Sequence, residues 1–174
     1  KMYKEGAIIY DIGGSEGSWI KTITEESDGN IHTINLDPNE DMSESFHKDK
    51  PESSEMILEA FYQGWEGVST HKPKVKADVV HESMMFQFIE TGGKRKEYIK
   101  EVSEKYLKKD GLFITEEKFK METQEEYQIN EDIKSEYKRR YFSEDQLRLK
   151  TENILEGMEE NQASFLQYLK ELNE

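Results

Sequence analysis

Short apolar runs alternate with segments of helical spacing along the first 115 residues of this chain. A strand buried on both faces of a parallel sheet is typically a continuous apolar run of four to eight residues. Four runs fit that description, at residues 7–11, 31–36, 77–80 and 112–115. Helical spacing fills the intervals at residues 16–25, 55–65 and 94–109. The alternation predicts an α/β fold, a parallel sheet with helices on both faces.

The length of 174 residues allows one domain with a real core. Within residues 1–174 we expect a core at 1–120, which would bind a cofactor, and a helical C-terminal segment at 121–174. A capping-box pattern from Ser143 to Gln146 predicts a helix start in that segment. The polar, turn-rich residues 39–53 predict a mobile loop, and residues 67–76 fit no single element.

The charge balance bears on possible partners. The net charge is −14, and each short basic run, such as Lys94-Arg95-Lys96, stands among acidic residues. Proteins that bind nucleic acid need clustered Lys and Arg to neutralise phosphates, so this balance disfavours a nucleic-acid partner. The chain has no cysteine, which excludes disulfides and thiolate metal sites. The histidines show no metal-ligand spacing, so we expect no metal.

Membrane and targeting signals are not evident in the sequence. No apolar run approaches the roughly 20 residues needed to span a bilayer, and no signal peptide opens the chain. We therefore expect a cytoplasmic protein with no membrane partner.

The stretch Asp11-Ile-Gly13-Gly14-Ser15-Glu16-Gly17 follows the first predicted strand and precedes a helix. In open α/β sheets, ligands bind beyond the carboxyl ends of the strands. The spacing Gly-x-Ser-x-Gly differs from the Gly-x-Gly-x-x-Gly turn of dinucleotide sites, and Glu16 would repel a phosphate at the helix N-terminus. The stretch favours an uncharged nucleoside with a cationic amino-acid tail; a tight turn with no ligand is the alternative.

An acidic residue also closes the second predicted strand. Asp37 lies 26 residues after Asp11 and precedes Pro38. A carboxylate at this place can accept hydrogen bonds from both hydroxyls of a ribose. The alternative is an Asp-Pro turn with no ligand.

Together these residues resemble the class I S-adenosylmethionine-dependent methyltransferases. Three blocks look like those of carboxy-S-adenosylmethionine synthases and related methyltransferases: Glu82–Ile89 (ESMMFQFI), Leu107–Phe119 (LKKDGLFITEEKF) and Tyr137–Met158. The resemblance implies a Rossmann-like methyltransferase sheet, S-adenosylmethionine as cofactor, and methyl transfer as the activity. The chain ends before the last two strands of the family fold.

The resemblance also implies roles for individual residues. Gly13, Gly14, Ser15 and Gly17 would pass under the cofactor, Asp11 would orient its amino group, and Asp37 would hold its ribose. Ser83 occupies the place of an asparagine that helps hold the cofactor in the synthase. Where the synthase has a Lys-Arg pair whose arginine grips an extra carboxylate, this chain has Lys150-Thr151. That departure disfavours carboxylate transfer.

Candidate catalytic residues follow the third predicted strand. His81 and Glu82 stand at its end, and His81 is the better base because its ordinary pKa lies near neutrality. A histidine hydrogen-bonded at a strand end is the alternative reading of the same position.

The sequence therefore predicts a methyltransferase acting on a small acceptor. Two alternatives remain: an enzyme like the carboxy-S-adenosylmethionine synthases, and a non-catalytic domain that serves assembly in a larger polypeptide. An open sheet edge could mediate contacts within a homo-oligomer or with a larger chain.

Overall fold

The computed structural model describes residues 5–58, 72–150 and 161–173. These divide into two compact units. One unit comprises Lys1–Met85 and Glu97–Glu117, and the other comprises Phe86–Lys96 and Lys118–Glu174. The expected division at residue 120 stays a prediction.

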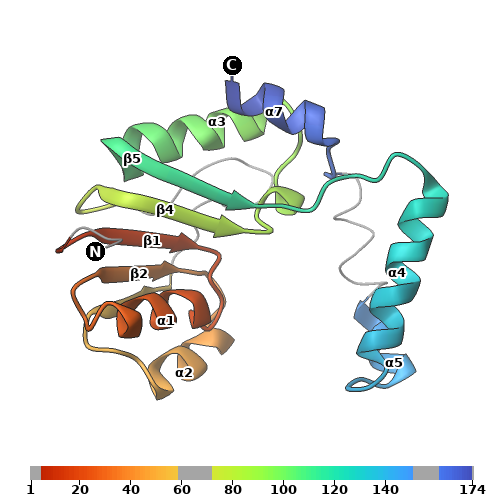
Figure 1. Cartoon of the computed structure of the whole chain (residues 1–174), viewed down its shortest axis with the longest axis horizontal. Coiled ribbons are helices and arrows are strands. Elements are labelled where there is room, and N and C mark those ends of the chain that lie inside the picture. The colour runs from red at the N-terminus through yellow and green to blue at the C-terminus, as the bar shows by residue number, and fades with distance from the viewer. Residues whose placement is uncertain (1–4, 59–71, 151–160, 174) are drawn as a thin grey trace. The chain divides into compact units, whose positions relative to one another are not determined.

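A five-stranded parallel sheet forms the centre of the first unit. Its strands are β1 (Ile8–Ile12), β2 (His32–Leu36), β3 (Ser54–Ile57), β4 (Ala77–Ser83) and β5 (Leu107–Glu116). Their order is β3-β2-β1-β4-β5, and the arrows of β5, β4, β1 and β2 point the same way in Figure 1. The predicted α/β class and all four predicted strands are confirmed.

The strand order changes direction at β1. The chain passes from β1 to β2 on one side, whereas β4 lies on the other side of β1 and leads outward to β5. Because crossovers between parallel strands are right-handed, α1 (Ser18–Glu26) and α3 (Gly93–Glu101) cover opposite faces of the sheet. A crevice for a ligand is expected where the order reverses, at the carboxyl ends of β1 and β4.

The apolar residues of the central strands form the core. Tyr10, Ile12, Ile34 and Leu36 are each at most 2% exposed, and Val80 is fully buried. Ala7, Ile9 and Ile31 form a second buried cluster, against which Ile23 and Val79 pack. Continuous apolar runs were a sound indicator here because both faces of these strands are covered.

Two expectations about residues 39–65 are wrong. Residues 39–53, expected as a loop, contain α2 (Asp41–Lys48), whose Phe46 is fully buried. Residues 55–57, expected to open a helix, belong to strand β3, and residues 59–65 lie outside the described part. The strand was missed because its buried residue is a serine. The Ser54 hydroxyl lies 2.7 Å from that of Thr33, its partner in register on β2.

The helix expected at residues 94–109 ends earlier than predicted. Helix α3 continues into a π-helical turn (Val102–Tyr106), and β5 begins at Leu107. Ala77 of β4 pairs with Leu107, but Val79 already pairs with Leu112, so the ladder contains an irregularity between them. Hydrophobic spacing does not reveal such a shift in register.

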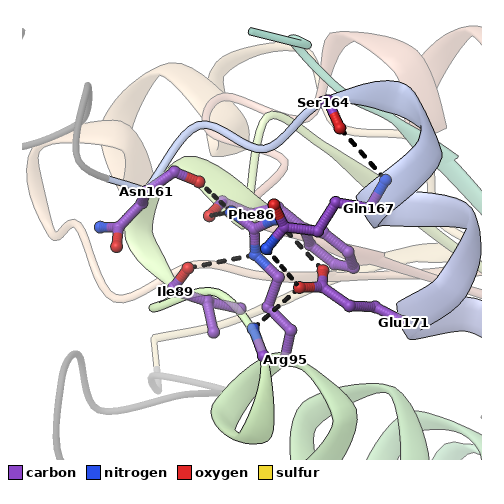
Figure 2. A network of polar contacts seen from close by, with 8 residues as sticks. Phe86, Ile89, Arg95, Asn161, Ser164, Gln167 and Glu171 are labelled. Carbon is purple, nitrogen blue, oxygen red and sulfur yellow. Dashed lines mark hydrogen bonds and ion pairs between the residues drawn. The ribbon is translucent and has the colours of Figure 1, made fainter.

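A buried arginine organises the second unit (Figure 2). Arg95 donates from Nε to the carbonyl of Ile89 at 3.2 Å and from Nη2 to the carbonyls of Phe86, at 2.9 Å, and Asn161. Its Nη1 lies 3.3 Å from Oε2 of Glu171, on α7 (Phe165–Asn173). The other oxygen of Glu171 accepts the backbone N–H of Gly92 at 2.8 Å. These contacts join residues 86–92, Asn161, α3 and α7 through one side-chain pair.

Helices α4 (Gln124–Lys138) and α5 (Glu144–Lys150) also follow β5 in the chain. Helix α4 starts with a capping box of Thr123 and Glu126 that the sequence analysis did not predict. The predicted capping box before α5 is confirmed, because Ser143 Oγ accepts from Gln146 N at 3.3 Å and Ser143 N donates to Gln146 Oε1 at 2.9 Å. Among the described residues, no helix has the length and apolar character needed to cross a bilayer.

Candidate functional site

The glycine-rich turn begins where β1 ends. Gly13 and Gly17 have φ angles of 72° and 73°, and Ser15 between them has a φ of 53°. Left-handed backbone is cheap for glycine and costly for most other residues, so the two glycines suit these positions. Gly13 N donates to the carbonyl of Leu36 at 2.8 Å, which joins the turn to the end of β2.

Gly14 is required for a different reason, namely space. A Cβ atom there would lie 2.3 Å from Oδ2 of Asp11 and 2.5 Å from Oδ1 of Asn35. A Cβ at Gly13 would lie 2.4 Å from the sulfur of Met85, and one at Gly17 would lie 2.6 Å from the ring of Phe46. Side chains from β2, α2 and the end of β4 therefore close in on this backbone. The lack of space for a side chain therefore requires glycine at all three positions, and left-handed backbone also favours it at Gly13 and Gly17.

Asp37 points at the turn and holds it. Its Oδ2 accepts the backbone N–H of Ser15 at 2.9 Å, and its Oδ1 accepts that of Asn39 at 2.8 Å. The residue is 7% exposed. Each carboxylate oxygen has two acceptor positions, so these two bonds leave capacity for further donors. A role of Asp37 in binding ribose stays a prediction.

Asn35 is a site residue that the sequence analysis missed. Its Nδ2 donates to the carbonyl of Ser15 at 2.7 Å, and it is fully buried. Its Oδ1 is buried without a hydrogen-bond partner among the described atoms. A polar residue inside the apolar run 31–36 was the available signal, because a buried amide needs partners.

Asp11 and His81 lie side by side across the β1–β4 ladder. Nδ1 of His81 lies 2.7 Å from Oδ1 of Asp11, and the residues are 7% and 2% exposed. Because a carboxylate only accepts hydrogen bonds, Nδ1 carries the proton of this contact. The ring of Trp19 stacks on the His81 ring with 3.9 Å between centroids. Residues from β1, β4 and α1 thus meet at one place.

Acidic groups dominate the surroundings of the turn. Glu16 accepts from the hydroxyls of Ser15, at 2.8 Å, and Ser18, at 3.0 Å. Its own backbone N–H, these two hydroxyls and the charge of Lys21 lower the pKa of Glu16, so it stays charged at neutral pH. With Asp11 and Asp37, three carboxylates surround the turn. In the described part of the chain, no Lys or Arg forms an ion pair with any of them.

Glu82 and Ser83 differ in their surroundings from His81. Glu82 is fully buried, and its Oε2 accepts a hydrogen bond from the Tyr98 hydroxyl. Burial, together with the Glu82 carboxylate, raises the pKa of Tyr98 well above its ordinary value. Ser83 is half-buried at the last position of β4, in register with Glu116 of β5. Glu82 is held inside the fold, whereas Ser83 ends at the carboxyl edge of the sheet.

The described residues contain no group of three His, Cys, Asp or Glu side chains that could hold a metal ion. Comparison of the sequence with protein-family models found no match, and neither did a search of curated proteins.

Solved structures do resemble this chain. One is a chain of the complex between the Haloferax volcanii Trm112 methyltransferase activator and a methyltransferase (TM-score 0.61, 12% identity, 99% of this chain and 62% of that one). Another is coclaurine N-methyltransferase bound to N-methylheliamine and S-adenosylhomocysteine (TM-score 0.52, 16% identity, 64% and 31%). A third is a Thiobacillus denitrificans methyltransferase with S-adenosylhomocysteine (TM-score 0.51, 15% identity, 64% and 42%).

The fold is that of the class I S-adenosylmethionine-dependent methyltransferases. The chain spans between 31% and 62% of the length of these three proteins. A methyltransferase fold with fewer strands than the family sheet was predicted, and the five-stranded sheet agrees with it. The finer resemblance to carboxy-S-adenosylmethionine synthases is not shown by the comparisons. Of the pair Lys150-Thr151, Thr151 lies outside the described residues.

Proposed function

We propose that this chain binds S-adenosylmethionine at the turn Gly13–Gly17 and transfers its methyl group to a small acceptor. The observation that carries the proposal is the charge around the turn. Asp11, Glu16 and Asp37 surround it. Among the described residues no Lys or Arg forms an ion pair with them, and the charge of Lys21 acts on Glu16 only from a longer distance. A cationic ligand suits this environment, and a pyrophosphate does not.

The donor and acceptor groups of the turn also fit such a ligand. The remaining acceptor positions of Asp37 are available for hydroxyl or ammonium donors. Glu16 places its own carboxylate just before the start of α1, where a dinucleotide-binding turn would hold a phosphate. Solved proteins of this fold that contain S-adenosylhomocysteine at a TM-score above 0.5 support the same class of ligand.

S-adenosylmethionine supplies a methyl carbon bonded to a sulfonium, which needs an aligned nucleophile and at most a base. His81 is the proposed base. Asp11 holds the proton on Nδ1, which leaves Nε2 as the nitrogen that can accept a proton from the acceptor. Trp19 fixes the plane of the imidazole by stacking. Glu82 was predicted as a second catalytic residue. Its buried hydrogen bond with Tyr98 fits a structural role better, namely holding the end of β4 in place.

Calorimetric titration of the chain with S-adenosylhomocysteine tests the proposal. We expect binding by the native chain and at least a tenfold weaker affinity for Asp37→Ala, because a lost charge-assisted hydrogen bond costs about 1.5–3 kcal/mol. Asp49→Ala is the matched control, since Asp49 is an exposed aspartate at the end of α2. Circular dichroism of each variant checks that the fold is retained.

Two outcomes would contradict the proposal. The absence of heat with both S-adenosylmethionine and S-adenosylhomocysteine would favour a non-catalytic domain that serves assembly. A copurified ligand whose mass includes an additional carboxylate would instead favour a synthase-like activity. Mass spectrometry of the purified chain distinguishes this second outcome from simple cofactor binding.

A further inference from the structure

Helix α4 exposes an apolar stripe on one face. Ile129, Ile133, Tyr137 and Tyr141 are 53%, 62%, 57% and 67% exposed. Residues spaced by four lie above one another on a helix, and the turn after Lys138 continues the spacing to Tyr141. We call these four residues the α4 stripe. A surface helix normally turns such a stripe toward the protein.

The opposite face of α4 is polar and makes the intramolecular contacts. Glu131 lies 2.8 Å from Nζ of Lys134 and 3.3 Å from Nζ of Lys118, and Lys118 also lies over the ring of Tyr127 at 5.5 Å. Burial acts to raise the pKa of Glu131, but the hydrogen bonds and charges of Lys134 and Lys118 outweigh it and lower that pKa. These contacts use the polar face and leave the α4 stripe exposed.

The end of the stripe is already ordered. The rings of Tyr137 and Tyr141 lie 5.5 Å apart, and the guanidinium of Arg140 lies 5.6 Å from the Tyr137 ring. Tyr and Arg are enriched at the centres of protein interfaces, in part because ordering them costs little entropy once they are stacked. This part of α4 therefore offers a prearranged contact surface.

The charges along α4 indicate what the stripe can bind. Residues 124–132 contain four acidic and no basic side chains, whereas residues 134–140 contain four basic and one acidic. Glu131, Lys134 and Arg139 already form ion pairs within the chain, and the charges left for a second copy include those of Glu125, Glu126 and Arg140. A second copy of the helix laid antiparallel brings these acidic and basic ends together. With Ile133 at the centre, Arg140 lies opposite Glu125 and Glu126 of the second copy, and Ile129 lies opposite Tyr137. Such complementarity fixes register and orientation.

We propose that the α4 stripe binds the α4 stripe of a second copy of this chain, antiparallel, with Ile133 on the two-fold axis. A closed pair of this kind is isologous, the commonest symmetry of oligomers. A single pair of helices of about 22 Å each buries less than a standard interface of about 1,600 Å². The net charge of −14 also opposes association. The dimer is therefore weak and depends on concentration.

Disulfide trapping tests the register, because the chain has no cysteine of its own. Under mild oxidation we expect Ile133→Cys to give a covalent dimer. The double variant Ile129→Cys/Tyr137→Cys should also cross-link, whereas Ile129→Cys alone should not, because in an antiparallel pair two residues 129 are about 12 Å apart along the axis. Gln128→Cys is the control, an exposed position on the same helix away from the stripe.

Charge reversal tests the orientation independently. Sedimentation equilibrium should show that Arg140→Glu weakens the dimer at least tenfold and that Glu125→Arg/Arg140→Glu restores it. Ile133→Glu should abolish the dimer, and Leu166→Glu, at a residue 70% exposed on α7, should leave it unchanged. None of these substitutions lies at the turn Gly13–Gly17, so each variant should bind S-adenosylhomocysteine as the native chain does. The test of the dimer is therefore separate from the test of the proposed function.

The proposal is overturned if the chain stays monomeric at high concentration and Ile133→Cys cross-links no better than Gln128→Cys. It is equally overturned if a dimer forms that Ile133→Glu does not weaken, since another surface, such as a sheet edge, then holds it. Cross-linking of Ile129→Cys alone would show a parallel pair and would contradict the antiparallel register.

Discussion

Among the described residues, the buried pairs Arg95–Glu171 and Asp11–His81 resemble each other in burial and differ in what surrounds them. Arg95 and Glu171 are 2% and 5% exposed, and Asp11 and His81 are 2% and 7% exposed. Arg95 also donates to three backbone carbonyls, and Glu171 accepts a backbone N–H (Figure 2). The pair of Asp11 and His81 is covered instead by one aromatic ring, Trp19, which is 36% exposed.

The difference agrees with a structural role for Arg95–Glu171 and with the chemical role proposed for His81. A guanidinium stays charged at any physiological pH, and here its donors are used to join chain segments. An imidazole can gain or lose a proton near neutrality, and this one stands at the carboxyl edge of the sheet, where ligands bind. Burial alone therefore does not distinguish the two pairs, and the proposal for His81 rests on its position and its remaining bonding capacity.

The largest expected effect is on stability, from Arg95→Met. Removing one partner of a buried pair typically costs about 3–5 kcal/mol, because the other charge remains buried. Urea unfolding should show this loss, and Arg95→Met/Glu171→Leu should recover part of it. Arg148→Met is the control, since Arg148 is 60% exposed in its pair with Asp145. A loss below about 1 kcal/mol for Arg95→Met would mean that this pair does not hold the unit together.

Gly14→Ala is expected to damage the turn and the Asp11–His81 pair together. The added Cβ would lie 2.3 Å from Asp11 Oδ2, so the carboxylate must move. We expect a loss of about 1–3 kcal/mol, as for overpacking in a core, and weaker S-adenosylhomocysteine binding by calorimetry. Gly93→Ala is the control, because a Cβ there meets no atom within 4 Å. Equal affinity in Gly14→Ala and the native chain would place the ligand elsewhere.

Two substitutions of His81 distinguish its roles. His81→Asn keeps a donor near Asp11, whereas His81→Ala removes it and should cost about 1–3 kcal/mol of stability. If His81 is the base, both variants lose methyl transfer to a protic acceptor while His81→Asn keeps most of its stability. Retained transfer in His81→Asn would assign this histidine a structural role. His32→Asn, at a side chain 44% exposed, should change neither property.

The smallest expected effect is that of Tyr98→Phe, which removes the hydrogen bond to Glu82 and should cost about 0.5–1.5 kcal/mol at pH 7. Burial and Glu82 raise the pKa of Tyr98 in the folded state. Above about pH 10 the Tyr98 phenol loses its proton in the unfolded state but keeps it in the folded state. The contribution of Tyr98 to the free energy of unfolding is therefore present below that pH and is lost as the pH rises. Denaturation at pH 7 and pH 10.5 should show a narrower gap between the two proteins at the higher pH. A constant gap would contradict the raised pKa.

Much of the fold could be predicted because its signals are local. The runs at 7–11 and 77–80 are buried strands, and the capping box at Ser143 is formed. The signals failed where a polar residue is buried, as at Ser54 of β3, or where a buried aromatic residue anchors a polar segment, as at Phe46 of α2. In both places a contact distant in sequence outweighs the local pattern.

The sequence by itself determined the sheet class, the turn after β1 and its acidic character, because apolar runs, glycines and carboxylates express these features within a few residues. Tertiary structure alone decided that Asn35 and Met85 close in on the turn, that His81 pairs with Asp11, and that the apolar side of α4 is exposed. The surroundings of the turn and the His81–Asp11 pair depend on strand register and on contacts between residues 20 to 70 positions apart, such as Asn35 with Ser15 and His81 with Asp11. A one-residue slip in register would send each side chain to the other face, and no local pattern encodes that choice.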